Sequence, residues 1–296
     1  MIIIGSGMSG MLAAHYFRHL EPVILEKQSE LPNNHKALLR FRSEVVSDLT
    51  GIPFKKVNVQ KMISFECAQL KQSNIFLNNM YSLKVTGSLR QRSIGNLEDC
   101  ERYIAPEDFI GKLSKGLDIK YNQDVSLIGF KIPVISTMPV YALAEKLGYE
   151  LSVKLESSEI FTTVIDLSVN SDVYQTVYYP SHKSAFYRIS ITGGKVIAES
   201  KFGKSDDVMR KHLLHHLKMD FGIETEANNF KVNYQKYGKL IECEGQQVKQ
   251  FLGWATRNHN IYSLGRWGTH RQILMDDVVK DIKQIDKLMN SNGYNV

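Results

Sequence analysis

The sequence predicts an α/β protein in which a domain with a parallel sheet is interleaved with a smaller, mainly β (α+β) domain. Three observations carry this prediction. The first residues, Met1–Ile4, form an apolar run that leads directly into a glycine-rich turn. Residues 151–249 then contain short segments rich in β-branched and aromatic residues, which is typical of strands. From residue 250 the chain returns to a strand, a glycine turn and a helix.

The first glycine turn has the spacing G-x-G-x-x-G, formed by Gly5, Gly7 and Gly10. In such a turn the first glycine permits a tight exit from the strand, and the second lets the backbone approach a pyrophosphate. The third lets the helix pack closely on the sheet, and the helix N-terminus faces the phosphate charge. These residues therefore predict a Rossmann-like β-α-β unit that binds a dinucleotide.

A second apolar run, Val23–Leu25, ends on Glu26. An acid at this place accepts hydrogen bonds from the adenosine ribose hydroxyls, which favours FAD or NAD over a 2′-phosphorylated cofactor. The alternative of a merely tight βα turn is disfavoured because strand, helix, second strand and acid fall in register. Arg40 and Arg42 follow closely in sequence. They are candidates for pyrophosphate or substrate contact, and ordinary surface charge explains them equally well.

The C-terminal segment repeats the pattern of an anion-binding end. Asn260–Leu264 reads as a strand, Gly265–Gly268 as a turn, and a helix with apolar residues at helical spacing begins at Met275. A strand, a glycine turn and a helix N-terminus together attract a phosphate group. Two such ends at opposite termini of one chain suit a cofactor long enough to touch both, which favours FAD over NAD.

Composition bounds the remaining classes. The 296 residues are 43% apolar and can bury a large core, and a net charge of +6 fits an anionic ligand or a nucleic acid. Cys67, Cys100 and Cys243 show no C-x-x-C spacing, so we expect reduced thiols. The apolar N-terminus lacks the basic segment of a signal peptide, and no apolar run reaches membrane-spanning length. We therefore expect a soluble, cytoplasmic protein.

Changes in composition give the expected domain boundaries: a discontinuous nucleotide domain of residues 1–65, 104–150 and 250–296, and a substrate domain of residues 66–103 and 151–249. Three helices are expected here: one from Pro106 to near Gly116, one over 141–147 and one over 206–219. The expected strands cover 81–87 with its turn, 134–139, 161–167, 173–179, 185–191 and 195–200.

The expected helix over 206–219 carries His212, His215 and His216 at i, i+3, i+4 spacing. That is the spacing of a metal-binding face, but no carboxylate recurs at matching spacing. We therefore expect a solvated basic face and no metal site.

Three stretches together resemble landmarks of one superfamily: the N-terminal fingerprint ending at Glu26, the segment Ile135–Pro139, and Gly265–Gly268 with Met275–Val278. The superfamily is that of the amine-oxidase-like FAD enzymes, with a glutathione-reductase-type FAD domain, and includes protoporphyrinogen oxidase and UDP-galactopyranose mutase. Tyr178–Pro180 followed by Phe186–Arg188 also resembles a strand of its substrate domain. The resemblance implies that the fingerprint holds the ADP half of FAD and that the C-terminal turn and helix start hold the flavin end.

The residues expected to bind FAD come from the fingerprint, its flanks and the two later landmarks. They are Gly5, Gly7, Ser9, Gly10, Glu26, Lys27, Arg40, Val125, Thr137, Gly265, Arg266, Met275 and Asp276.

The chain departs from the superfamily in two respects. Asn33–His35 replaces the usual double glycine after the ribose-binding acid, and the chain is short for the family. The loop His35–Ser43 is more weakly similar to small phage-encoded flavoproteins of DNA-hypermodification gene sets. A second G-x-G-x-x-G is absent from the sequence, so we expect no separate NAD(P)H domain.

Three functions are open on this reading. The first is an FAD-dependent oxidoreductase that takes a hydride from a carbon next to nitrogen. The second is a redox-neutral mutase or lyase acting on an anionic substrate, such as a sugar nucleotide or a modified nucleotide in phage DNA. The third is a non-catalytic nucleotide-binding protein. The pattern identifies no catalytic residue, and the substrate-side candidates are Arg90, Arg92, Tyr179, Tyr187 and Arg188.

Overall fold

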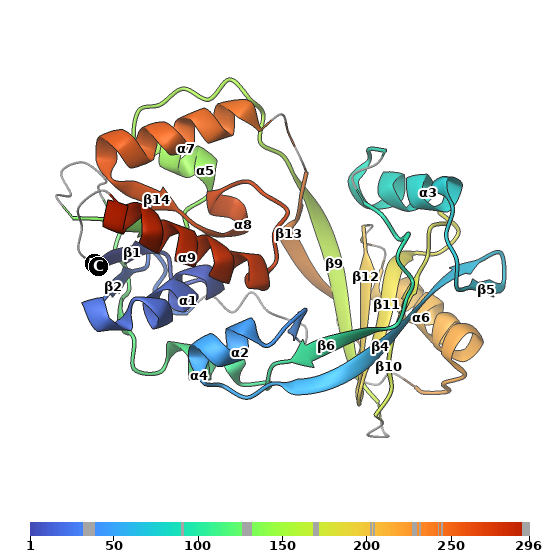
Figure 1. Ribbon diagram of the computed structural model, residues 1–296. Helices are drawn as coiled ribbons and strands as arrows, with labels where there is room; N and C mark the ends of the chain where they lie inside the picture. Colours follow the sequence, from blue (N-terminus) through green and yellow to red (C-terminus); the bar gives the residue numbers. More distant parts are fainter. Residues whose placement is uncertain are drawn as a thin grey trace.

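The structure is a computed structural model that describes residues 1–31, 39–89, 92–125, 132–167, 172–201, 203, 205–226, 230, 232–241, 243 and 245–291. Arg90 and the segment Asn33–His35 lie outside these residues. The described chain forms two sheets, one parallel and one mostly antiparallel, that stand side by side (Figure 1). The predicted α/β class with a second, mainly β part is confirmed.

The parallel sheet has the strand order β14-β8-β1-β2-β7. Its strands are β1 (Ile2–Ile4), β2 (Val23–Leu25), β7 (Asp118–Lys120), β8 (Val134–Ser136) and β14 (Ile261–Ser263). Both neighbours of β1 pair with it in parallel, and Ile4 lies opposite Leu25 and Ser136. All five strands therefore present their carboxyl ends at one edge of the sheet.

Helices cover both faces of this sheet, because alternate residues of a strand point to opposite sides. Ile3 packs in one core with α1 (Met8–Tyr16) and α9 (Met275–Ser291). Ile4 packs in the other with α5 (Val140–Lys146) and α7 (Gln246–His259). The smaller helices of this part are η1 (Arg18–Leu20), α2 (Val45–Thr50), α4 (Phe109–Ser114) and α8 (Gly265–Gly268).

The second sheet has nine strands in the order β13-β9-β12-β11-β10-β4-β6-β3, with β5 paired to β4. Its strands are β3 (Arg40–Phe41), β4 (Lys55–Phe65), β5 (Ala68–Leu70), β6 (Cys100–Ile104), β9 (Ser157–Asp166), β10 (Tyr174–Tyr178), β11 (Phe186–Thr192), β12 (Lys195–Ser200) and β13 (Val232–Leu240). The long strand β4 lies wholly in this sheet, although residues 55–65 fall in the range that composition assigned to the nucleotide domain.

One face of the nine-stranded sheet is apolar and is covered by α6 (Asp206–Phe221), whose buried residues include Met209, Leu213 and Leu217. The opposite face is the more polar one, although Ile63, Ile160 and Tyr187 on it pack with α3 (Ile75–Thr86). It carries buried side chains of alternate strand residues: Thr162, Thr176, Ser190, Thr192 and Glu199.

The polar face is turned toward the parallel-sheet part of the molecule. Lys195 on this face forms an ion pair with Glu107, which precedes α4, at 3.2 Å. His270, between α8 and α9, lies 3.1 Å from the carbonyl oxygen of Ile241, just after β13. The two parts therefore meet across the polar side of the sheet.

The prediction of a strand and turn over 81–87 is wrong, because residues 81–86 are the second half of α3 (Ile75–Thr86). Asn74 caps the start of α3 by accepting a hydrogen bond from the Leu77 amide at 2.9 Å, and Gly87 ends it with φ of 76°. The helix buries Leu77, Tyr81 and Val85 in one cluster with Ile63 of β4, and this packing overrides strand propensity.

Two further expectations need correction. The helix expected to start at Pro106 begins at Phe109, since Pro106 forms a turn in which its carbonyl accepts from the Phe109 amide at 3.0 Å. The expected turn Gly265–Gly268 is a single helical turn, α8. None of the helices in the described part of the chain is long and apolar enough to cross a membrane.

Candidate functional site

The glycine turn after β1 is as tight as its spacing predicts. A Cβ at Gly5, whose φ is +96°, would lie 2.3 Å from Thr137 Oγ1, and a Cβ at Gly10 would lie 2.0 Å from the Gly5 carbonyl oxygen. At Gly7 a Cβ would meet nothing within 4 Å. The first and third glycines are thus required by close packing, whereas the second leaves open space beside the backbone.

Three turns converge at the carboxyl edge of the parallel sheet. The turn after β8 contacts the end of β1, because the Thr137 amide and hydroxyl each donate to the Ile4 carbonyl at 2.9 Å. The turn after β14 contacts the first helix, since a Cβ at Gly265 would lie 2.6 Å from Ser9 Oγ. This is the edge at which open α/β sheets bind their ligands.

Glu26 is held in one orientation at the end of β2. One carboxylate oxygen accepts hydrogen bonds from the Ser6 amide at 2.7 Å and the Ser6 hydroxyl at 2.8 Å. The other accepts from the Gln28 amide at 2.9 Å. Sequence reasoning missed Ser6, whose only signal was its place between two fingerprint glycines.

The neighbouring candidates Lys27 and Val125 lie beside Asp124. The ammonium of Lys27 is exposed and pairs with Asp124 at 3.1 Å, and Lys146 pairs with the same carboxylate at 2.7 Å. Lys146 also donates to the Val125 carbonyl at 3.2 Å, and the Val125 side chain packs against the core that contains Ile4.

Asp276 joins the start of α9 to the loop before α2. Its carboxylate is buried and accepts from the Ser43 hydroxyl at 2.6 Å, the Ser43 amide at 2.8 Å and the Arg42 amide at 3.3 Å. Met275 packs beside it against the core that contains Ile3. The Asp276 side chain is therefore directed at the protein backbone.

Arg266 connects α8 by hydrogen bonds to the segment that leads into α9. Its Nε and Nη2 donate to the Ile273 carbonyl at 3.3 and 3.1 Å. Burial, with the nearby charge of Arg92, lowers the pKa of Arg266.

Arg40 extends onto the polar face of the nine-stranded sheet. Its guanidinium donates to the hydroxyl of Ser190 at 3.2 Å and lies 3.5 Å from that of Thr176. Burial, reinforced by the charge of Arg188, lowers the pKa of Arg40 to about 10. Both hydrogen-bond partners are neutral, and the attraction of Glu199 is outweighed by burial and by the charge of Arg188.

A charged cluster lies on this polar face around Glu199. The guanidinium of Arg188 pairs with the Glu199 carboxylate, Tyr187 donates its hydroxyl to it at 3.0 Å, and Lys239 lies 3.5 Å from it. The Lys239 ammonium is also 5.6 Å from the centre of the Tyr187 ring. Glu199 and Lys239 were missed in the sequence, where each looks like an ordinary polar residue of a strand.

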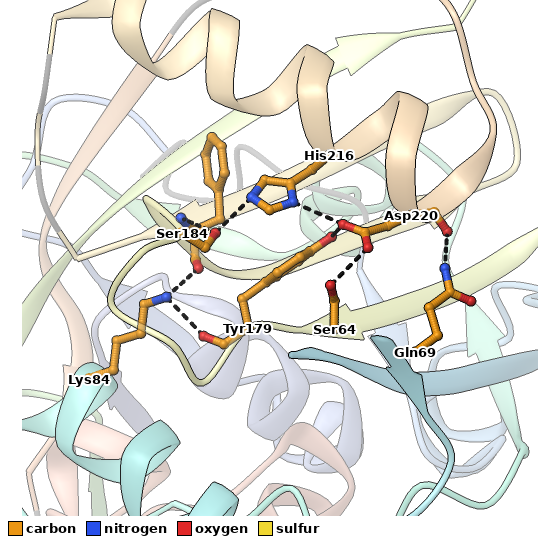
Figure 2. A network of polar contacts seen from close by, with 8 residues as sticks. Ser64, Gln69, Lys84, Tyr179, Ser184, His216 and Asp220 are labelled. Atoms are coloured by element: carbon orange, nitrogen blue, oxygen red, sulfur yellow. Dashed lines mark hydrogen bonds and ion pairs between the residues drawn. The ribbon is translucent and has the colours of Figure 1, made fainter. Parts of the chain in front are cut away.

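Tyr179 belongs to a different network, on the other side of the sheet (Figure 2). Its hydroxyl donates to Asp220 at 2.9 Å, and Ser64 donates to the same carboxylate at 2.8 Å. His216 lies between Asp220 and Ser184, with Nδ1 2.9 Å from Asp220 and Nε2 2.9 Å from Ser184 Oγ.

This arrangement corrects the expectation of a solvated histidine face for His216, whereas His215 is exposed as expected. For His216 the carboxylate partner exists, because Asp220 follows four residues later on α6. The His216 side chain is 14% exposed and its ring lies 4.3 Å from the Tyr179 ring. The network is enclosed and ties α6 to β4 and to the turn before β11.

Lys84 supports the same turn from α3. Its ammonium donates to the carbonyl oxygens of Tyr179 at 2.8 Å, Ser181 at 2.6 Å and Phe186 at 2.6 Å. Burial lowers the pKa of Lys84 to about 7.

The chain is similar to known proteins in structure and not in sequence. No protein-family profile matches the chain, and no curated protein matches it in sequence. A protein from Exiguobacterium sp. named for protoporphyrinogen oxidase is similar over 98% of both chains, with 11% identity and a TM-score of 0.63. A reduced UDP-galactopyranose mutase is similar over 98% of this chain and 93% of its own, with 12% identity and a TM-score of 0.65.

The chain has the fold of the superfamily that its sequence resembles. A fatty acid isomerase from P. acnes shares that fold over 97% of both chains, with 10% identity and a TM-score of 0.60. The similarity in each case extends over both sheets, because it covers nearly all of this chain. The predicted resemblance is thus confirmed at the level of the fold.

Proposed function

We propose that this protein is an FAD-dependent enzyme of the oxidoreductase type. The observation that carries the proposal is the glycine turn, in which Gly5 and Gly10 are packed too tightly for any side chain while the backbone at Gly7 faces open space. That is the arrangement a pyrophosphate needs in order to approach the backbone at a helix N-terminus.

The residues present fit the two ends of FAD. Gly7 and the first turn of α1 would receive the pyrophosphate. Glu26, fixed by Ser6, would accept hydrogen bonds from the ribose hydroxyls, and the turn at Gly265–Arg266 would meet the flavin side. Bound FAD supplies redox chemistry, in our first reading the acceptance of a hydride from a carbon next to nitrogen.

A second reaction is favoured by a specific observation. The polar face that meets the nucleotide part carries Arg40, Arg188 and Lys239 around the Glu199 carboxylate. Such an excess of cations suits an anionic substrate, as in a redox-neutral mutase or lyase. These residues would bind and orient the substrate and exclude water from it.

An absorption spectrum of the purified protein, followed by heat release and identification of the cofactor, tests the FAD assignment. Released FAD is the expected result, and a colourless protein that takes up no added FAD would overturn the assignment. Anaerobic addition of substrates then separates the two reactions. Oxidation of an amine bleaches the flavin until oxygen is admitted, whereas a redox-neutral reaction forms product without consuming oxygen.

A further inference from the structure

The polar face of the nine-stranded sheet gathers more positive charge than its own carboxylates can balance. Five cationic side chains belong to this group: Arg40, Arg92, Arg188, Lys239 and Arg266. On the face itself, Arg188 and Lys239 contact Glu199, and Arg40 contacts Ser190. The charges of Arg92 and Arg266 act on Lys239, and the charge of Arg102 also acts on Arg40. Among the described residues, the ion pairs of this group involve a single carboxylate, that of Glu199. We call these six residues the cationic cluster.

The one carboxylate is already neutralised. Arg188 pairs with Glu199 through its Nε and an Nη, and Lys239 shares the second oxygen at 3.5 Å. Two of the other cations contact neutral acceptors. Arg40 reaches hydroxyls, and Arg266 reaches a backbone carbonyl.

Arg92 shows the same imbalance at a single atom. Its Nε is buried and has no hydrogen-bond partner among the described residues. Its charge also acts on Lys239 and on Arg266. A buried donor that lacks an acceptor costs free energy, and a bound anion would remove that cost.

Lys239 is subject to the same excess of positive charge. Burial lowers the pKa of Lys239 to about 8. The attraction of Glu199 raises it, and the charges of Arg188, Arg92 and Arg266 lower it further. The Tyr187 ring lies against the ammonium. A negatively charged ligand placed among these groups would favour the protonated amine and raise this pKa.

We propose that the cationic cluster binds a small substrate through a phosphate-type group bearing at least two negative charges, such as a diphosphate. The proposal rests on the proposed function, because it places this substrate beside the flavin end at Arg266. Guanidinium groups bind phosphate oxygens through paired hydrogen bonds, and the cluster supplies several of them.

The enclosure of the cluster favours a small molecule over a nucleic acid. The side chains of Glu199 and Lys239 are only 9% and 16% exposed, and that of Arg188 is 32% exposed. A nucleic-acid backbone is tracked by an open groove of exposed cations. Here the cations lie where the two parts of the molecule meet.

Calorimetric titration of the FAD-loaded protein with inorganic pyrophosphate tests the proposal. We expect binding that weakens about 10- to 100-fold in Arg92→Met and in Lys239→Met, as for the loss of a hydrogen bond to a charged group. The matched control is Lys249→Met, an exposed lysine on α7, which should bind pyrophosphate as the wild type does. Circular dichroism and flavin content show that each variant is folded.

Proton uptake is a second readout, and it distinguishes an anion bound next to Lys239 from one attracted only by the net charge of the protein. Titrations at pH 8 in buffers of different ionisation enthalpy should show proton uptake on binding, because the anion raises the pKa of Lys239 from about 8. Lys239→Met should abolish that uptake while Lys249→Met retains it.

The contrary outcomes are distinct. Absence of pyrophosphate binding, or binding unchanged in both cluster variants, would overturn the subsite. Tighter binding of a duplex DNA oligonucleotide that depends on Lys239 would replace it with a nucleic-acid site. If the protein takes up no FAD, the proposed function fails. The comparison of Lys239→Met with Lys249→Met in the flavin-free protein then still decides whether the cluster binds the anion.

Discussion

Tyr187 and Arg188 are adjacent in strand β11 and yet lie on the same face of the sheet. The cause is a β-bulge, since the pairing of β11 with β12 shifts between Phe186 and Arg188. Two residues of the bulged strand thus oppose one residue of its partner, and both contact Glu199. The bulge is therefore what lets one carboxylate hold an arginine and a tyrosine at the polar face.

Glu199 should contribute to stability in a pH-dependent way. Burial opposes its ionisation, but Arg188, Lys239 and the Tyr187 hydroxyl outweigh burial and hold the pKa of Glu199 to about 2. A carboxyl group whose pKa is lower in the folded state stabilises the fold above its unfolded pKa, and this contribution is lost as the pH falls toward 2.

Glu199→Gln tests that contribution. Removing the carboxylate leaves Arg188 and Lys239 uncompensated, so we expect a loss of about 3–5 kcal/mol at pH 7. Urea unfolding between pH 7 and pH 3 measures it. The difference between wild type and variant should shrink as the pH falls below about 4.3. A difference that stays constant over this range would contradict the assignment of the charge.

Gly7→Ala and Gly10→Ala form a matched pair that separates binding from folding. A Cβ at Gly7 meets nothing within 4 Å, and φ there is −63°, so the variant should fold with wild-type stability. Its methyl group would occupy the approach of the pyrophosphate, and we expect FAD affinity to fall at least about tenfold. Fluorescence titration of the flavin-free protein measures this.

Gly10→Ala should instead damage the fold. Its Cβ would lie 2.0 Å from the Gly5 carbonyl oxygen, and a backbone atom cannot move aside cheaply. We expect a loss of at least about 1–3 kcal/mol together with loss of FAD. Equal stability of the two alanine variants would show that the Gly5 carbonyl leaves room for a side chain at position 10.

Ser6→Ala tests how firmly Glu26 must be held. The variant loses the 2.8 Å hydrogen bond from the Ser6 hydroxyl but keeps the amide hydrogen bonds to the carboxylate. We expect a loss of about 1 kcal/mol in unfolding free energy and a weaker affinity for FAD. Unaltered FAD affinity in a destabilised variant would restrict Ser6 to a structural role.

Asp220→Ala should destabilise the part of the molecule built on the nine-stranded sheet and leave FAD binding unchanged. The change removes the carboxylate that three side chains contact, those of Ser64, Tyr179 and His216. We expect a loss of about 2–4 kcal/mol, since buried donors lose their acceptor. The control is His215→Ala, an exposed neighbour on the same helix, which should stay within about 0.5 kcal/mol of the wild type. Comparable losses of unfolding free energy in the two variants would show that the hydrogen bonds to Asp220 do not stabilise α6.

The sequence alone determined the parts of the molecule whose geometry is local. The spacing of Gly5, Gly7 and Gly10 within one β-α-β unit dictates a tight turn, because a strand exit and a helix start separated by a few residues leave no room for a side chain at Gly5 or Gly10. The apolar periodicity of α9 likewise sufficed to place that helix. Both features depend on neighbours in the chain.

Tertiary structure decided the rest. Strand propensity at 81–87 yielded to packing of α3 on Ile63, a contact that the local sequence does not specify. The cationic cluster unites Arg40, Arg92, Arg188, Lys239 and Arg266 with Glu199, from segments far apart in the chain. Each side chain read singly is an ordinary charge. Only the pairing of strands, with one bulge in β11, brings these charges together, because electrostatic energy depends on separation in space and on burial.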